Sequence, residues 1–370
     1  SGSTRCRDVH LMANQVKLNH SNSTRVPADD LHIQLSLIFR AVGTTDRHAE
    51  IAAKVLVAAS VRGVDTHGVS NVVGYSKNAE DGVYTVPQQT TVISESETTA
   101  LVSGGNGIGL VSAYEAMEMA IAKAKKHGLG MVSIKDGHHV GMVAYYASMA
   151  LEHDMIGMSM TTAAPAVRPA LGARKMLGTN PIGFAAPAGE ERDFFLDMAT
   201  STVASGKVGL ARRIGVPIPA GWGVSVPDGG EITEPPDGEN DDWALNPLGN
   251  TREQGSHKGY GLAVMVDILC GVLSGGGFSN QLDRGENMSW VMAIDIACFR
   301  DVDEFKSMMD DMIRELHATP TLPGVDRVLV PGDPEADSMD DRLVNGVPVE
   351  NGQYAAIKAR AAEVGVEVVI

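Results

Sequence analysis

The fold is decided by residues 99–160, which read TALVSGGNGIGLVSAYEAMEMAIAKAKKHGLGMVSIKDGHHVGMVAYYASMALEHDMIGMSM. Three apolar runs in this stretch have the length of strands: Thr99–Val102, Gly130–Ile134 and Ile156–Met160. Between them, residues 111–126 and 143–153 carry apolar side chains at the three-to-four spacing of amphipathic helices. This strand–helix–strand–helix–strand order predicts an α/β fold with at least one crossover connection.

Signals outside this stretch extend the prediction in both directions. Helices are expected at residues 28–42, 46–62, 258–273, 302–317 and 354–364. Strands are expected at residues 183–186, 193–197 and 290–298, and loops at residues 227–257 and 331–341. Residues 1–26 are rich in Ser and Asn and lack the apolar core of a signal peptide, so we expect a disordered tail or tag remnant.

A glycine-rich turn follows the first of these strands. Gly105, Gly107 and Gly109 open a helix, which is the setting of a dinucleotide-binding fingerprint. The spacing fails, because the sixth position counted from Gly105 is Leu110 and Asp136 comes too late to hold a ribose. We therefore expect these glycines to serve a tight turn and close helix packing rather than a Rossmann site.

The charge balance argues against several classes of function. Lys and Arg total 30 while Asp and Glu total 46, and the resulting net charge of −16 repels nucleic acid and anionic lipid. The longest apolar run, residues 259–273, is too short to cross a membrane. Cys6, Cys270 and Cys298 form no metal-ligand spacing and no disulfide framework, so we expect a cytoplasmic protein, with organellar import left open by the tail.

A histidine lies in the segment GVDTHG, residues 63–68, between two predicted helices. Because imidazole titrates near neutral pH, His67 presented by such a loop can donate or accept a proton in catalysis. Asp65 would raise its pKa or fix its tautomer. A loop histidine with only a structural hydrogen bond is the simpler alternative.

Two more histidines, His138 and His139, follow a predicted strand in the segment DGHHVG. The carboxyl end of a strand that leads into a helix is where α/β proteins place ligands. Together with Asp65 and His67 the pair also admits a metal site, and with it a metal-dependent hydrolase or lyase. Adjacent side chains point in different directions, so one of the two histidines is expected to be structural.

Polar side chains stand at three further element ends. Thr179 and Asn180 precede Pro181, Asp197 ends a predicted strand, and Lys258 begins a predicted helix. Asp197 suits a ribose hydroxyl, and Lys258 at the positive end of a helix suits a phosphate or carboxylate. A structural role, such as a helix cap, explains each of them equally well.

Eight segments occur in order along the chain: GVDTHG (63–68), AMEMAI (116–121), HVG (139–141), LGTNP (177–181), LDMATS (196–201), GK (206–207), IPAGW (218–222) and KGYG (258–261). In this order they resemble the malate/L-lactate dehydrogenase family of non-Rossmann type, which includes sulfolactate, ureidoglycolate and diketogulonate oxidoreductases and cyclic-imine reductases. The resemblance covers most of residues 30–335. It implies hydride transfer between nicotinamide and C2 of a small 2-hydroxy or 2-oxo acid.

The resemblance also implies an architecture. It implies a non-Rossmann, three-layer mixed-sheet NAD(P)-binding domain, expected over residues 86–334 with a Pro/Gly/acidic excursion at 227–257. It implies a separate helical domain from residues 27–85 and 335–370. Members are typically homodimers with active sites near the subunit interface, so a second copy and a small acid are the expected partners, without nucleic acid, membrane or metal.

Individual roles follow from the resemblance. His67 matches the proton donor, His139 a second active-site histidine that takes the acid–base role in some members, and Tyr75 a substrate-pocket tyrosine. The positions that match cofactor contacts are Thr179, Asn180, Asp197, Met198, Ala199, His257, Lys258, Gly332, Asp333 and Pro334. The cofactor is expected to be NAD or NADP. Acidic Glu190 and Glu191 disfavour a 2′-phosphate, although Arg192 is adjacent, so NAD is slightly preferred.

One position departs from the family pattern. Members usually have an arginine four residues after the loop histidine that pairs with the substrate carboxylate, and here that position is Asn71. A neutral amide forfeits a charge-assisted pair, a difference of about 1.5–3 kcal/mol. We expect Arg168, in the segment PAVRP, to replace it, with a surface arginine as the alternative. A cyclic-imine (piperideine- or pyrroline-2-carboxylate) reductase and an inactive small-molecule-binding homologue remain open.

Overall fold

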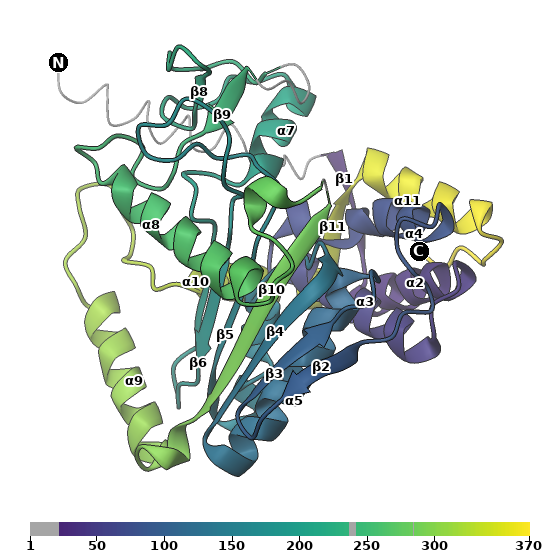
Figure 1. The fold of residues 1–370 in the computed structure, drawn as a ribbon, viewed down its shortest axis with the longest axis horizontal. Coiled ribbons are helices and arrows are strands. Elements are labelled where there is room, and N and C mark those ends of the chain that lie inside the picture. The colour runs from purple at the N-terminus through teal and green to yellow at the C-terminus, as the bar shows by residue number, and fades with distance from the viewer. Residues whose placement is uncertain (1–21, 237–241, 284) are drawn as a thin grey trace.

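A computed structural model describes residues 22–236, 242–283 and 285–370, and a seven-strand mixed sheet forms its centre (Figure 1). Across the sheet the strands are β2 (Thr91–Glu95), β3 (Thr99–Ser103), β4 (Leu129–His138), β10 (Glu286–Asp295), β5 (Met155–Thr161), β6 (Ile182–Ala186) and β7 (Phe194–Met198). Only β3 and β4 are parallel neighbours in this sheet; the other neighbouring pairs are antiparallel. The mixed pairing confirms the predicted α/β class and differs from the parallel sheet of a Rossmann fold.

The parallel pair is the predicted crossover unit. From β3 the chain returns through α5 (Gly109–His127) to β4, and Gly128, with a φ of 82°, ends the helix in the left-handed conformation. The next connection differs from a simple crossover, because β10 lies between β4 and β5. The helix predicted over residues 143–153 is short, comprising α6 (Ala144–Ser148) and a 3₁₀ turn at Leu151–His153.

Helices cover both faces of the sheet, as the three-layer prediction requires. Along β10, Val291 packs in the core that contains α5, whereas Trp290 packs against the helix α8 (Ser256–Val266) and the π-helical turn Asp267–Val272. Neighbouring strand residues point to opposite faces, so these two contacts place α5 and α8 on opposite sides of the sheet. The remaining helices of this part are α7 (Ser205–Ile214) and α9 (Val302–His317).

A group of helices from both parts of the sequence lies beside the sheet (Figure 1). It consists of α2 (Ala28–Ala41), α3 (Asp46–Val61), α4 (Val72–Glu80), α10 (Asp333–Asn345) and α11 (Asn351–Glu363). β1 (Ser23–Val26) pairs antiparallel with β11 (Val347–Glu350) and ties the two sequence regions together. The main core runs without a break from Leu35 and Leu56 of these helices to Val102 and Ile134 of the sheet. The predicted division into two domains stays a prediction.

Two expectations are corrected here. The predicted tail includes residues 23–26, but these form β1, because Val347–Glu350 offers a strand edge that no local pattern reveals; residues 1–21, with Cys6, lie outside the description. Residues 331–341, predicted as a loop, begin α10. This helix starts with Asp333, Pro334 and Glu335, which are favourable in a first turn, but it is too acidic to show an apolar stripe.

The excursion at residues 227–257 contains one short strand in its described part, β9 (Trp243–Leu245), which pairs with β8 (Gly223–Ser225); residues 237–241 are outside the description. The strand predicted to Cys298 ends at Asp295, whose carboxylate accepts a hydrogen bond from the Ala297 amide and starts a 3₁₀ turn. Among the described residues, no helix combines the length and the apolar character needed to cross a membrane.

Candidate active site

His67 sits at the end of a 3₁₀ turn, Asp65–His67, that follows α3. Gly63, with a φ of 82°, lets the chain leave the helix, and Gly68 approaches Ser60 so closely that a Cβ there would lie 2.0 Å from Ser60 Oγ. Ser60 Oγ in turn accepts a hydrogen bond from the Val69 amide at 3.0 Å. The glycines that the sequence places around the histidine are therefore needed for this tight turn.

Asp65 does not touch His67, contrary to the expectation that it would tune the imidazole. Its carboxylate pairs with both terminal nitrogens of Arg342, at 2.5 and 3.1 Å. Nδ1 of His67 instead lies 3.0 Å from the Thr66 hydroxyl, and burial lowers the His67 pKa below its ordinary value. The sequence carries no local sign of the Arg342 contact, because the two residues are 277 positions apart.

His139 lies directly after β4 and faces His67. The two rings stack with centroids 5.4 Å apart and an angle of 22° between their planes. The Tyr75 hydroxyl on α4 lies 2.5 Å from His139 Nδ1, and burial, followed by repulsion from His67, lowers the pKa of His139 to about 3. The structure thus brings together three of the predicted site residues, His67, His139 and Tyr75.

His138 points elsewhere, as expected for one of two adjacent histidines. Its Nδ1 lies 3.0 Å from the Gly285 carbonyl, and its ring packs against Tyr84 with centroids 4.5 Å apart. The metal-site alternative requires Asp65, His67, His138 and His139 to face one ion. In the structure His138 bonds the Gly285 carbonyl and Asp65 pairs with Arg342, so these two side chains are engaged elsewhere. Within residues 22–236, 242–283 and 285–370, no group of three His, Cys, Asp or Glu side chains is arranged to hold a metal ion.

The glycine-rich turn before α5 serves packing, as predicted from its failed fingerprint spacing. A Cβ on Gly109 would lie 2.1 Å from the His138 carbonyl oxygen, and one on Gly107 would lie 2.4 Å from the Gln88 side chain. The Gln88 amide also bonds the Ile108 backbone, accepting from its N–H at 2.7 Å and donating to its carbonyl at 3.2 Å. Gln88 therefore occupies the helix start where a Rossmann fold would hold a pyrophosphate.

The candidate cofactor residues gather at the edge of the sheet where β4, β5 and β7 end. Register places His138 of β4 opposite Glu286 and Thr161 of β5 opposite Ser289, while Met198 of β7 pairs with Ile182. Because these strands run in the same direction, the loops that follow them leave from one edge. The segments after residues 138, 161 and 198 therefore lie over a common edge of the sheet.

Asp197 sits on this edge, near the end of β7, with Met198 and Ala199 half-buried after it. Its carboxylate accepts a hydrogen bond from the Ala144 amide at 2.9 Å, at the start of α6. Burial raises the Asp197 pKa to about 6, an effect that the Ala144 bond opposes and nearby Glu335 reinforces. A partly desolvated carboxylate of this kind is suited to accept hydrogen bonds from hydroxyl groups.

The side chain of Asn180 is engaged within the protein, so a cofactor contact at this position, which stays a prediction, would be made by its backbone. Asn180 is 0% exposed and takes the left-handed conformation with a φ of 38°. Its amide nitrogen donates to the Ala263 carbonyl and Asp267, and its oxygen accepts from the Ala163 amide and the Ser279 hydroxyl. Asn180 is therefore a structural residue that holds the loop after β5, while neighbouring Thr179 is half-buried.

His257 and Lys258 are exposed in the first turn of α8. Leu248 connects this turn with the segment that follows Asp197, because its backbone contacts both. The Leu248 amide donates to the Thr200 carbonyl at 2.9 Å, and a Cβ on Gly259 would lie 2.5 Å from the Leu248 backbone. The side chains of His257 and Lys258 and the carboxylate of Asp197 thus lie on connected segments at this end of the molecule.

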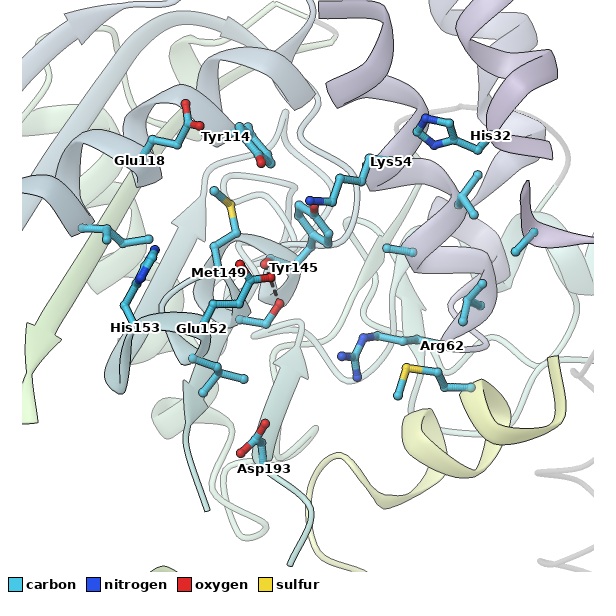
Figure 2. A pocket seen from close by; sticks show the side chains of 18 of the residues that line it. His32, Lys54, Arg62, Tyr114, Glu118, Tyr145, Met149, Glu152, His153 and Asp193 are labelled. Atoms are coloured by element: carbon cyan, nitrogen blue, oxygen red, sulfur yellow. Dashed lines mark hydrogen bonds between the residues drawn. The ribbon is translucent and has the colours of Figure 1, made fainter. Parts of the chain in front are cut away.

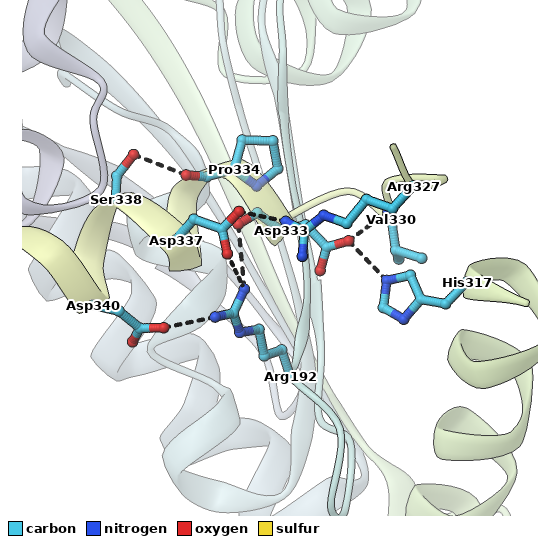
Figure 3. A network of polar contacts seen from close by, with 9 residues as sticks. All are labelled: Arg192, His317, Arg327, Val330, Asp333, Pro334, Asp337, Ser338 and Asp340. Atoms are coloured by element: carbon cyan, nitrogen blue, oxygen red, sulfur yellow. Dashed lines mark hydrogen bonds and ion pairs between the residues drawn. The ribbon is translucent and has the colours of Figure 1, made fainter. Parts of the chain in front are cut away.

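The segment Gly332–Pro334 leads into α10 and lies against β7. Gly332, with a φ of 105°, packs against Phe195, and the Phe195 amide donates to the Pro331 carbonyl at 3.2 Å. Figure 3 shows that the Asp333 carboxylate faces His317, at 2.8 Å, and it also accepts from the Val330 amide at 2.9 Å. Both bonds go to Oδ2 of this buried carboxylate, and the cofactor role of the segment stays a prediction.

Asn71 and Arg168 both have partners within the protein. The Asn71 amide donates to the carbonyls of Thr66 and Gly68, at 3.1 and 3.2 Å, and so braces the turn that carries His67. Arg168 donates through Nε to Asn246 at 2.7 Å and through Nη1 to the Gly172 carbonyl at 3.3 Å. The exchange of substrate-binding roles between positions 71 and 168 stays a prediction.

Two cavities lie near the helical group, and neither contains both histidines. The larger, about 790 Å³, is seen in Figure 2; it lies between α2, α3, α5 and α6, with Tyr114, Tyr145 and Lys54 among its lining residues. The smaller, about 560 Å³, lies between the His67 turn and α7, with Thr66, Asn71 and Arg213 in its walls. The larger cavity therefore does not mark the predicted site, and the smaller one borders it.

The acidic pair used to prefer NAD lies away from the candidate site. Glu190 and Glu191 form ion pairs with Arg314 on α9, in the turn that precedes β7. Asp197 lies near the other end of that strand, at the edge described above. The pair is therefore remote from Asp197, whereas neighbouring Arg192 donates to the Asp333 carbonyl at 3.5 Å, and the preference for NAD stays a prediction.

Comparison with known proteins identifies the family of the chain. Residues 26–358 match the family described as malate/L-lactate dehydrogenase. A malate dehydrogenase of Pyrococcus abyssi is 38% identical over 94% of this chain and 96% of its own length. A malate/(S)-sulfolactate dehydrogenase of Methanothermus fervidus is 35% identical over 89% and 95%. The crystal structure of malate dehydrogenase from Entamoeba histolytica superposes with a TM-score of 0.90 at 30% identity, covering 93% and 99%. The chain therefore belongs to the malate/L-lactate dehydrogenase family and is a dehydrogenase.

Proposed function

We propose that this dehydrogenase transfers a hydride between NAD(P) and C2 of a small 2-hydroxy or 2-oxo acid of the malate, lactate or sulfolactate type. The observation that carries the proposal is the stacked pair of His67 and His139, with ring centroids 5.4 Å apart. Two imidazoles from separate segments offer one oxygen atom both a proton-transfer group and a hydrogen-bond donor. The names of the relatives support the substrate class.

His67 is the acid–base residue in this proposal. When its Nδ1–H donates to the Thr66 hydroxyl, Nε2 carries the lone pair that accepts the proton of the substrate hydroxyl. Burial lowers the His67 pKa, which keeps the ring neutral near pH 7 and ready to act as the base. In the reverse direction the imidazolium returns the proton to the oxygen formed from the carbonyl.

His139 holds the same oxygen without exchanging its proton. When the Tyr75 hydroxyl donates to Nδ1, the ring hydrogen lies on Nε2, which makes that atom a hydrogen-bond donor. With a pKa of about 3, His139 stays neutral throughout the physiological range. We assign proton transfer to His67 and hydrogen-bond donation to His139 because their Nδ1 atoms have different partners. Nδ1 of His139 faces the phenol of Tyr75, whereas Nδ1 of His67 faces the Thr66 hydroxyl.

The residues at the edge of the sheet fit a dinucleotide. Asp197 would accept hydrogen bonds from ribose hydroxyls, the backbone of Met198 and Ala199 would line the same segment, and Lys258, with His257, would attract phosphate at the start of α8. The bound nicotinamide supplies the hydride chemistry, and the protein supplies orientation and the proton path. Neither NAD nor NADP is preferred by this arrangement.

The proposal includes a homodimer. The apolar segment of α8 and the following π-helical turn leaves Ile268, Val272 and Leu273 with 51%, 58% and 60% of their surface exposed. A helix that is apolar on every side is normally covered, so this face suits a second copy of the chain. Light scattering behind size exclusion tests it: we expect twice the chain mass, reduced to one by Val272→Glu, and a monomeric wild type contradicts it.

A spectrophotometric screen at 340 nm tests the reaction. NADH and NADPH are each offered with pyruvate, oxaloacetate, sulfopyruvate, oxalurate, diketogulonate and piperideine-2-carboxylate, with a chelator in parallel samples. We expect turnover of at least one 2-oxo acid that resists the chelator, and little of it in His67→Ala. Turnover of the imine alone would favour the cyclic-imine reductase. Tight NADH binding with no turnover of any compound would contradict the proposal.

A further inference from the structure

One side chain from the far end of the sequence reaches the turn that carries His67. Arg342, on α10, is 6% exposed and lies between the end of α3 and this turn. Its Nη1 donates to the Ser60 carbonyl and to Asp65 Oδ1, both at 2.5 Å, and its Nη2 donates to Asp65 Oδ2 at 3.1 Å. A planar guanidinium held by three acceptors fixes their relative positions more strictly than a single charge pair would.

The backbone around the turn leaves little room for it to move independently of α10. A Cβ on Gly63 would lie 2.8 Å from the hydroxyl of Ser338, which is one helical turn before Arg342. On the opposite side, Gly68 packs against Ser60. The turn is therefore clamped between α3 and α10, and Arg342 is the charged contact across that clamp.

The contact between Arg342 and Asp65 also neutralises the carboxylate that lies next to the His67 turn. Asp65 lies two positions before the histidine, and an unpaired carboxylate there would stabilise the imidazolium form. The other titratable groups near His67 are His139 at the end of β4, Tyr75 on α4 behind it, and Arg212 and Arg213 across the smaller cavity. With Asp65 paired to Arg342, burial is the cause that sets the His67 pKa below its ordinary value.

We propose that Arg342 is a positioning residue for the acid–base step: it fixes the Asp65–His67 turn and screens His67 from the Asp65 carboxylate. The proposal rests on the proposed function of His67 for its kinetic consequence. Its electrostatic consequence is a property of the folded protein and does not depend on which substrate is used. The bonds of Arg342 go to the Ser60 carbonyl and to Asp65, so we place its effect on His67 in the turn rather than in direct contact with the reacting groups.

The test uses Arg342→Gln, Arg342→Lys and the double variant Asp65→Asn/Arg342→Gln of the full chain. Arg25→Gln is the matched control, because Arg25 pairs with Asp341 on the same helix at 2.9 Å but is exposed and lies on β1. We measure kcat and KM, the pH profile of kcat, the dissociation constant of NADH and the histidine titration by NMR.

In Arg342→Gln we expect kcat to fall about tenfold or more with an unchanged NADH dissociation constant, because the proton donor is displaced. We expect the His67 titration to move to higher pH, since Asp65 loses its partner. The double variant should return the titration to the wild-type pH while kcat stays low. Arg342→Lys should keep the titration and still lower kcat, and Arg25→Gln should change neither.

A His67 titration that does not move in folded Arg342→Gln overturns the screening role. A wild-type kcat in Arg342→Lys or in the double variant overturns the positioning role. If Arg342→Gln does not fold, Arg342→Lys and the double variant, which leave no unpaired charge, decide the positioning role. Asp65→Asn then decides the screening role: it leaves the Arg342 cation without its carboxylate partner, so the His67 titration should move to lower pH, and a titration that does not move overturns the screening role. If His67→Ala keeps full activity while the NMR titrations behave as expected, the proposed function fails and the electrostatic inference stands.

Discussion

The hydroxyl of Tyr75 lies 2.5 Å from Nδ1 of His139, and this contact distinguishes His139 from His67. A phenol that donates to one ring nitrogen assigns the hydrogen to the other and fixes the direction in which the ring can donate. The two histidine rings stack on each other, but their Nδ1 atoms have different hydrogen-bond partners. Nδ1 of His67 faces the Thr66 hydroxyl, whereas Nδ1 of His139 faces the Tyr75 hydroxyl. The first prediction concerns this contact.

Tyr75→Phe removes the hydroxyl and leaves the ring packed against Tyr84 and His139. We expect kcat/KM for the 2-oxo acid to fall about tenfold or more, because the neutral His139 ring becomes free to adopt the wrong tautomer. NADH affinity should not change. Steady-state kinetics and a fluorescence titration measure the two quantities, and an unchanged kcat/KM would show that the phenol has no part in the reaction.

The pH dependence separates the two histidines. Carbonyl reduction needs protonated His67, so its rate should fall as pH rises through a pKa that burial holds below 6.5, and alcohol oxidation should rise through the same pKa. His139, with a pKa of about 3, adds no step between about pH 5 and pH 9. Rate profiles in both directions should lose this step in His67→Gln and keep it in His139→Gln; the reverse would exchange the two roles.

His67→Ala should lower kcat by ~10²–10⁴, the usual contribution of a general acid or base. Cofactor binding should survive, because the residues that we assign to the dinucleotide lie at the edge of the sheet. A stopped-flow measurement of hydride transfer and a titration with NADH test the two parts separately. A near-normal kcat in this variant would move the acid–base role to His139.

The buried Asp197 carboxylate is expected to lower the free energy of unfolding at neutral pH, although we propose that it binds the cofactor. Its pKa is raised from 3.8 to about 6, so the folded state binds more protons than the unfolded state between these values, and stability falls as pH rises through this window. Asp197→Asn should therefore raise the free energy of unfolding by up to about 3 kcal/mol at pH 7.5, and by much less near pH 4. Urea unfolding at both pH values measures it, and NADH affinity should fall in the same variant.

Asn180 has a purely structural role in these contacts, and its removal should cost stability. Asn180→Ala removes the partner of the Ala163 amide, while Asp267 keeps its bonds from Ser279 and the Ala263 carbonyl keeps its bond from the Asp267 amide. The unpaired amide and the lost bonds should together lower the free energy of unfolding by about 2 kcal/mol. Exposed Asn280 offers the matched control, Asn280→Ala, which should change it little. Equal effects in the two variants would refute the structural assignment.

Much of the fold could be predicted because its signals are local. The strands and helix of residues 99–134 and the amphipathic helix Val302–His317 have clear apolar periods, and the structure confirms them. α10 was missed because its acidic sequence conceals any apolar stripe, and β1 because its partner strand lies more than 300 positions away. The spacing of apolar residues along the sequence reveals a helix or strand only where that element has one apolar and one polar face.

The candidate site divides in the same way. The glycine-framed histidines were found because residue type and spacing indicate a turn with a titratable group. Asn180 looked equally suitable for a ligand, but its amide bonds four protein groups from three other segments. The sequence around Arg342 gives no indication of its contact with Asp65, because Asp65 lies 277 positions earlier in the chain. Pairings between distant segments are what a single sequence leaves undetermined.

The place of β10 in the sheet has a consequence for synthesis of the chain. Residues 286–295 form the strand that joins β4 to β5, so both of those strands have an unpaired edge until residue 295 has left the ribosome. Such edges readily pair with other chains, and nascent protein at this stage is exposed to aggregation. Translation pauses or chaperone capture would matter most before this segment emerges, and a circular permutant that makes it early should be less dependent on either.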